Sequence, residues 1–143
     1  MITGVYGSTI SSYLTLEEKR IHTDVDASKV RYLFKFTNDL TKTVKYSYGR
    51  KISTNDRYIK NDFLHNTTDS VLDFTINFKP YGFWKYEVYE VTWIGTVFLE
   101  AGNAPTTETE ILSVHNDNGV VKGKVEEGKL YIQETAGSEQ IKY

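Results

Sequence analysis

The sequence predicts an all-β fold, a sandwich of antiparallel strands, from three observations. Apolar and polar residues alternate in the segments 30–37 and 71–79, which is the pattern of a half-buried strand. Turn-forming residues separate these segments from shorter strand candidates. The strong helix formers leucine and alanine are sparse, while 14% of the residues are aromatic. Roughly seven to nine short strands separated by turns are typical of a sandwich or barrel.

The two alternating segments define the predicted core. One face of the first carries Val30, Tyr32, Phe34 and Phe36, and one face of the second carries Leu72, Phe74, Ile76 and Phe78. We expect both faces to point inward, because strict alternation over eight or more residues suits a half-buried antiparallel strand. Weaker strand candidates lie at residues 10–16, 43–48, 57–64 and 129–133.

The segment 94–120 departs from this pattern and predicts one elaborated loop or hairpin. Its centre, AGNAPTTETE, is polar and contains one of the chain's two prolines, so we expect a projecting contact loop within 94–118. Asn118-Gly119, between SVH and VVKG, predicts a tight hairpin turn, and ILSVH an extra strand. No second core, repeat or linker is evident, so the prediction is a single domain, 1–143, with flexible termini.

The stretch KPYGFWKYEVYEV, residues 79–91, is rich in aromatic residues. Its rings could either form an exposed platform for a ligand or belong to a core strand. Trp84, Tyr86 and Val88 share one uniformly apolar face, which predicts burial. The alternating segment before it, the Pro80-x-Gly82 corner and this strand resemble the E–F corner of immunoglobulin-like sandwiches. Trp84 takes the place of the corner tyrosine and Tyr86 that of the second cysteine. The cysteine pair is absent, so the resemblance is to the architecture.

Composition narrows the classes of partner. The net charge of −2 disfavours nucleic acid, because phosphate binding needs a basic face. A small basic patch for nucleic acid is still possible and would consist of Lys42, Lys45, Arg50 and Lys51. The absence of cysteine removes disulfides, thiolate nucleophiles and cysteine-ligated zinc. No apolar run approaches the roughly 18 residues of a membrane helix, and residues 1–12 lack a secretory pattern.

The sequence predicts no catalytic, cofactor-binding or metal-binding residues, and hence no enzyme. His22, His65 and His115 are far apart and form no metal-binding motif. Glu87 and Glu90 are three apart on a predicted strand and point to opposite faces, whereas a glycosidase needs two carboxylates across a cleft. No nucleophile elbow, phosphate loop or dinucleotide motif occurs. The other paired carboxylates are Asp24 with Asp26 and Glu126 with Glu127.

Four segments resemble small β-rich structural proteins of bacteriophage virions, of the kind found in crAss-like and marine podovirus-like phages. They are YLFKFTN at Tyr32–Asn38, DRYIKNDF at Asp56–Phe63, GFWKYEVYE at Gly82–Glu90 and EEGKLYI at Glu126–Ile132. The resemblance implies a capsid-associated, head-fibre or decoration protein, made in the host cytoplasm and located in the virion. Its implied partners are other capsid or fibre proteins and further copies of itself, with neither nucleic acid nor membrane.

Two kinds of contact surface remain as alternatives. For a virion protein, we expect contacts through Asn103–Glu110, Met1–Tyr13 and Glu134–Tyr143, the two ends being ordered only by a partner. The alternative is a carbohydrate-binding module that recognises a host surface glycan through exposed rings. Its candidate rings are Tyr46, Tyr48, Tyr58, Tyr81 and Trp93.

Overall fold

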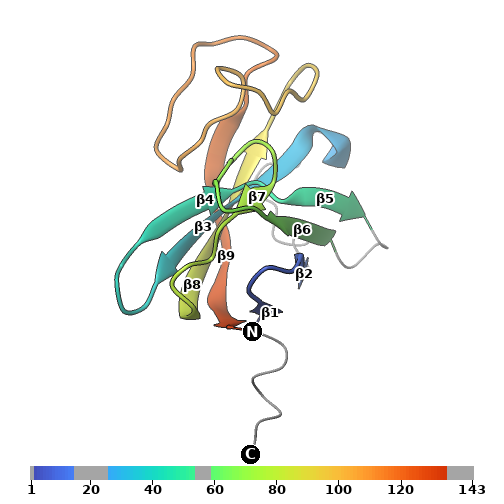
Figure 1. The fold of residues 1–143 in the computed structure, drawn as a ribbon. Helices are drawn as coiled ribbons and strands as arrows, with labels where there is room; N and C mark the ends of the chain where they lie inside the picture. Colours follow the sequence, from blue (N-terminus) through green and yellow to red (C-terminus); the bar gives the residue numbers. More distant parts are fainter. Residues whose placement is uncertain (1, 15–25, 54–58, 135–143) are drawn as a thin grey trace, which may run out of the picture.

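The computed structural model describes residues 2–14, 26–53 and 59–134, which form two β-sheets packed face to face (Figure 1). The larger sheet has the order β1 (Ile2–Val5), β9 (Val120–Gln133), β8 (Gly82–Thr92), β3 (Val30–Asn38), β4 (Val44–Ser47). The smaller has the order β2 (Ile10–Leu14), β6 (Ile59–His65), β5 (Arg50–Ser53), with β7 (Thr75–Ile76) beside β6. These residues contain no α-helix, only the 3₁₀ turn η2 (Ala27–Lys29). The predicted all-β sandwich is confirmed.

The sequence predicted purely antiparallel strands, but the structure also contains parallel pairs. β1 runs parallel to β9, and β7 runs parallel to β6. β1 and β2 are consecutive in the chain but belong to different sheets, and their residues Ile2 and Ile10 are buried in the core. The expectation that Met1–Tyr13 is a flexible end is therefore wrong for residues 2–13. Apolar burial and pairing within the chain itself order this segment.

The core between the sheets is built on the inner face of β8. Trp84, Tyr86 and Val88 have exposed fractions of 0%, 5% and 0%, as the alternation predicts. Trp84 packs edge-on against Phe78, with ring centroids 5.6 Å apart, and its indole Nε1 donates to the Pro80 carbonyl at 3.1 Å. Phe34 of β3 meets Phe63 of the opposite sheet at 4.8 Å. Aromatic contacts of this edge-to-face kind join the two layers.

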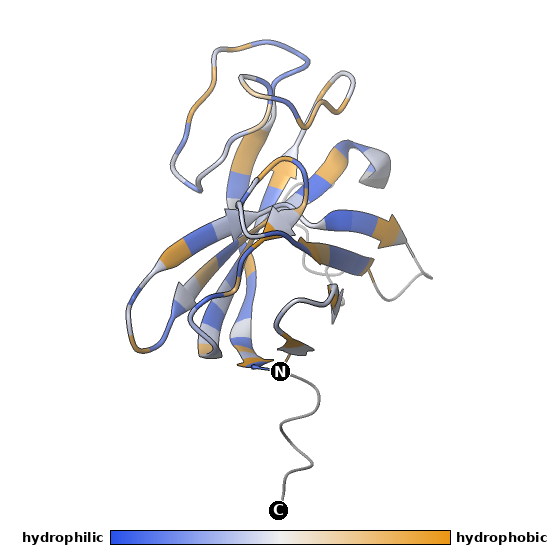
Figure 2. Ribbon diagram, viewed as in Figure 1, coloured by the Kyte–Doolittle hydropathy of each residue, from blue (hydrophilic) through white to orange (hydrophobic). Residues whose placement is uncertain are grey.

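A second apolar cluster lies on the outer face of the larger sheet, where the sequence suggested none. Its buried members are Leu33, Tyr48, Val91, Trp93 and Ala104. The strands β3 and β8 contribute to both clusters, and Figure 2 shows hydrophobic residues interspersed along these strands and along the loops beyond them. The larger sheet is thus covered on both faces at the end from which residues 94–119 extend.

The predicted long strand over 71–79 is wrong, because its apolar residues divide between the two clusters. Only Thr75–Ile76 is a strand, and Ser70 and Thr75 close a turn by exchanging backbone hydrogen bonds of 3.0 and 3.2 Å. Phe74 has φ +65°, a left-handed conformation that interrupts an extended strand. As a result Leu72 and Phe74 pack in the outer cluster, while Ile76 and Phe78 enter the main core.

The predicted hairpin at Asn118-Gly119 is also wrong. No strand forms at 113–115. The turn that follows is closed by a hydrogen bond of 3.0 Å from the Asn118 amide to the His115 carbonyl. Gly119 serves a different purpose, since a Cβ at this position would lie 2.6 Å from the Trp93 ring. The glycine lets the backbone cross the face of the indole.

The two faces of β8 differ in their contribution to stability. Replacing Trp84 by alanine is expected to lower the free energy of unfolding by about 3–5 kcal/mol, because a fully buried ring leaves a cavity. The matched control is Phe83→Ala, whose ring is 49% exposed and whose loss should cost about 1 kcal/mol. Urea denaturation of both variants measures the difference. Equal losses would contradict the assignment of the inner face.

Candidate interaction surface

Residues 94–119 leave β8, extend beyond the sandwich and return into β9 (Figure 1). Their middle is anchored to the outer face of the larger sheet, because Ala104 and Pro105 are buried. The hydroxyl of Tyr48, which follows β4, donates to the Pro105 carbonyl. Burial of this tyrosine raises the pKa of its hydroxyl well above the usual range, so it remains a donor at neutral pH. The predicted contact loop is therefore a folded part of the domain.

Two asparagines close the loop on itself. The Gly119 amide donates to the Asn103 carbonyl at 2.8 Å, and the Asn103 side-chain amide donates to Asn118 Oδ1 at 3.0 Å. Asn118 Nδ2 in turn donates to the Ser113 carbonyl at 2.8 Å. These bonds satisfy polar groups that an irregular segment would otherwise leave unpaired, and they fix its shape.

A carboxylate in the loop provides a third anchor. Glu108 accepts 2.6 Å hydrogen bonds from Lys35 Nζ of β3 and from the Tyr46 hydroxyl of β4. Burial alone would raise the pKa of Glu108, but the bonds from Lys35 and Tyr46 outweigh it and hold the pKa below its usual value. Burial, and then the hydrogen bond to Glu108, raise the pKa of Tyr46. Glu108 is therefore an ionised acceptor at neutral pH, linking the loop to the sheet.

The anchored loop leaves aliphatic side chains in solvent. We call Ile94, Ile111, Val114 and Val120 the loop surface. Their exposed fractions are 74%, 93%, 106% and 52%. Ile111 and Val120 line a hollow of about 400 Å³. Contiguous exposed apolar residues rimmed by polar ones mark protein-binding sites, and Ile111 and Val120 meet this condition around the hollow.

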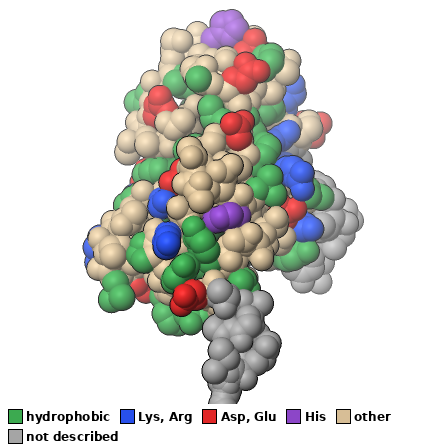
Figure 3. All heavy atoms as spheres, viewed as in Figure 1, with side chains coloured by type: hydrophobic (Ala, Val, Ile, Leu, Met, Phe, Trp, Pro, Cys, Tyr) green, Lys and Arg blue, Asp and Glu red, His purple; other side chains and the backbone are tan. Residues whose placement is uncertain are grey.

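The loop surface is acidic as well as apolar. Residues 94–119 contain Glu100, Glu108, Glu110 and Asp117 and no lysine or arginine. Figure 3 shows acidic and hydrophobic side chains close together at this end of the molecule. A partner for this surface is expected to combine an apolar recess with positive charge.

The most exposed apolar residues of the loop lie later in the chain than most of the predicted contact residues. Within Asn103–Glu110, the first residues face the domain itself, and Ala104 is only 1% exposed. The most exposed aliphatic residues follow in ILSVH, which was expected to form an extra strand and is not a strand in the structure. The sequence signal for them was a run of aliphatic residues inside a polar segment. Of Glu134–Tyr143, only Glu134 belongs to the described residues, and it is exposed.

The rings proposed for sugar stacking do not form a platform. Tyr48 and Trp93 are 1% and 0% exposed, so neither can meet a ligand. Tyr46 is bonded to Glu108, and Tyr81 meets Tyr6 at an interplanar angle of 75°. Tyr58 lies outside the described residues. The carbohydrate alternative stays a prediction, because the four candidate rings that the structure describes do not form a coplanar exposed set.

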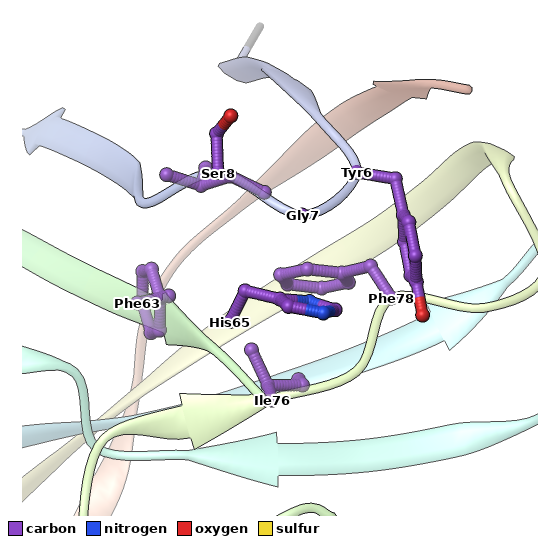
Figure 4. A pocket seen from close by; sticks show the side chains of 8 residues that line it. Tyr6, Gly7, Ser8, Phe63, His65, Ile76 and Phe78 are labelled. Carbon is purple, nitrogen blue, oxygen red and sulfur yellow. The ribbon is translucent and has the colours of Figure 1, made fainter. Parts of the chain in front are cut away.

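The two described histidines lie in separate places, His65 among aromatic residues and His115 beside a single carboxylate. Figure 4 shows His65 beside Tyr6 and Phe78, and its ring centroid is 4.8 Å from that of Tyr6. The space between these residues is about 10 Å³, the size of one water molecule at most. His115 is exposed beside Asp117, and His22 lies outside the described residues. Among the described residues no group of three or more His, Asp or Glu is placed to hold a metal ion.

Glu87 and Glu90 point to opposite faces of β8, whereas Glu87 and Glu127 are cross-strand partners that share Lys85 and Lys124. Glu87, on the outer face of β8, accepts from the Tyr89 hydroxyl at 3.1 Å and faces Lys85 at 3.5 Å, whereas Glu90 is fully buried on the inner face. This opposite orientation is the one that the sequence predicts. Glu126 and Glu127 lie on β9 opposite this part of β8. Asp26 is exposed at the start of η2, and Asp24 lies outside the described residues.

The basic residues considered for nucleic acid are largely occupied within the domain. Lys45 pairs with Asp69 at 2.8 Å, and Arg50 with Asp62 at 3.5 Å. Lys51 Nζ donates to the Val30 carbonyl at 3.0 Å. Lys42 lies apart from them in the β3–β4 turn. These residues do not make a continuous basic face in the part of the chain described.

Comparison with protein-family models, curated proteins and solved structures found no match to this chain. Within the described ranges, no helix is long and apolar enough to cross a membrane.

The Tyr48 hydroxyl is expected to hold the loop in place. Replacing Tyr48 by phenylalanine leaves the Pro105 carbonyl without this donor and should lower the free energy of unfolding by about 1–3 kcal/mol. Amide hydrogen exchange over residues 94–119 should accelerate more than exchange in β3. The control is Tyr13→Phe, which removes a hydroxyl from a ring that is 56% exposed. Unchanged exchange in the loop would contradict the anchor.

The Glu108 anchor is expected to weaken in acid. A carboxylate whose pKa is lowered by folding stabilises the fold above its unfolded pKa, about 4.3, and loses that contribution as the pH falls through the folded value. Wild type should exceed Glu108→Gln in unfolding free energy by about 1 kcal/mol at pH 7, and by much less at pH 3. Urea denaturation at both values tests this. A difference that persists at pH 3 would show that ionisation is not the cause.

Proposed function

We propose that the protein is a non-enzymatic structural component of a bacteriophage virion that acts through protein–protein contacts. The observation that carries the proposal of a contact role is the loop surface. Three of its exposed aliphatic residues stand on a segment that Tyr48 and Glu108 fix to the sheet and that the two asparagines close on itself, and the fourth, Val120, follows at the start of β9. A preorganised apolar surface favours binding because little conformational entropy is lost when a partner docks.

The virion assignment is supported by the resemblance of Gly82–Glu90 and three other segments to small phage structural proteins. These segments lie in β3, β6, β8 and β9, four strands that supply most of the main core. The loop surface lies outside these four segments. A shared framework with a separate contact segment suits a family of particle proteins with different neighbours.

An immunoglobulin-like architecture also belongs to this proposal. The order β9-β8-β3-β4 corresponds to G-F-C-C′, and β2-β6-β5 to B-E-D, of that sandwich. The bond from Trp84 Nε1 to the Pro80 carbonyl takes the role of the tyrosine corner, in which a hydroxyl bonds the backbone a few residues upstream. Domains of this architecture serve widely as binding modules, with loops at the ends of the sandwich making contacts.

The proposal is tested on particles of a phage that encodes the chain. Replacing Ile111 and Val114 together by asparagine should reduce the amount of protein in purified particles at least tenfold, since each buried aliphatic side chain contributes about 1.5–3 kcal/mol. Quantitative mass spectrometry of particles and of the host lysate separates assembly from expression. Tyr13→Asn, which alters an exposed ring on β2, is the control and should assemble normally. Absence of wild-type protein from the particles would refute the proposal.

A further inference from the structure

A second apolar site lies at the opposite end of the larger sheet. Leu40 in the β3–β4 turn and Phe83 at the start of β8 are 91% and 49% exposed. Together with Tyr81, Gly82, Asn38 and Asp39 they line a hollow of about 340 Å³, which we call the basal hollow. Three of the six lining residues, Leu40, Phe83 and Tyr81, have large apolar side chains.

Hydrogen bonds join the two walls of the basal hollow. The Asp39 amide donates to the Phe83 carbonyl at 3.0 Å, and Asn38 Nδ2 donates to the Pro80 carbonyl at 3.3 Å. Asn38 Oδ1 also accepts from the Leu40 amide at 2.9 Å, which fixes the turn. The basal hollow, like the loop surface, is therefore preformed.

The length of β8 separates the two sites. β8 begins at Gly82 in the basal hollow and ends at Thr92, where residues 94–119 begin. Its 11 residues place the ends roughly 35 Å apart at the rise of an extended strand. Figure 1 shows the β3–β4 turn and the loop at opposite ends of the sheet.

The charges around the two sites are opposite in sign. The loop contains no lysine or arginine and carries four carboxylates, of which Glu108 is paired with Lys35 and the other three are Glu100, Glu110 and Asp117. Beside the basal hollow, Asp39 is neutralised by Lys129 at 2.7 Å, while Lys42 and Lys79 are both exposed on the turns that form its walls. Contact between two acidic loops would be repulsive, whereas contact between the loop and the basal hollow is electrostatically favourable.

We propose that the loop surface of one copy of this chain docks into the basal hollow of a second copy. The inference rests on the proposed function, because it names the partner of the same surface. Ile111 and Val114 supply exposed aliphatic groups, and Leu40, Phe83 and Tyr81 form the apolar recess that receives them. Lys42 and Lys79 face the carboxylates of the incoming loop.

This contact is heterologous, since it joins two different surfaces. Each copy keeps a free loop at one end and a free hollow at the other, so the contact continues into a row or a closed ring of copies. Copies in the assembly share a polarity that follows the direction of β8.

The test uses two variants of the full chain, each blocked at one end. The loop variant is Ile111→Asn with Val114→Asn, and the hollow variant is Leu40→Asn. All three side chains are more than 90% exposed, so folding should be unaffected, and circular dichroism checks this. Tyr13→Asn is again the control. Sedimentation equilibrium over a concentration series measures the mass of each protein and of the 1:1 mixture of the loop and hollow variants.

Wild type and Tyr13→Asn are expected to gain mass with concentration, whereas each blocked variant should self-associate at least tenfold more weakly. The mixture should form a complex limited to two chains, twice 16.5 kDa, because each variant supplies the site that the other lacks. A hollow variant that still dimerises, a mixture that fails to pair, or a wild type that stays monomeric overturns the inference. In each case the loss of the loop variant from phage particles remains an independent test of the virion role.

Discussion

Burial of Trp84, Tyr86 and Val88 between the two sheets is the constraint on which the rest of the structure depends. β8 pairs with β3 on one side and with β9 on the other, so its orientation sets the inward face of the whole larger sheet. The rings that meet it come from both sheets and from the segment after β7. Loss of this contact would remove the apolar area that holds the layers together.

The outer face of the same sheet explains why an irregular segment of this length is ordered. Leu33, Val91 and Trp93 are buried under the loop, and the backbone at Gly119 crosses the Trp93 ring where no side chain would fit. The loop thus gains apolar burial of its own and is not held by hydrogen bonds alone. A long loop in a compact domain needs such a source of stability, and long ordered loops are commonly functional.

The same anchoring gives the exposed residues their significance. Scattered aliphatic residues on a surface are ordinary, but Ile111 and Val114 stand on a segment that the hydrogen bonds of Asn103 and Asn118 close on itself. The basal hollow has the same character, because hydrogen bonds join the turn of Leu40 to the start of β8. Two preformed sites at opposite ends of a rigid sheet favour contacts along the sheet direction, and the acidic loop favours a basic partner.

The sequence by itself determined the all-β class, the strand β3 and the buried face of β8, because alternation with a period of two depends only on neighbouring residues. It misplaced Leu72 and Phe74, since alternation cannot distinguish one buried layer from two, and both residues pack in the outer cluster. It suggested the loop as a contact segment but not which residues are exposed. Only the tertiary structure decided that Ala104 is buried and Ile111 exposed, because burial there depends on contacts with Tyr48 and Trp93, distant in the chain.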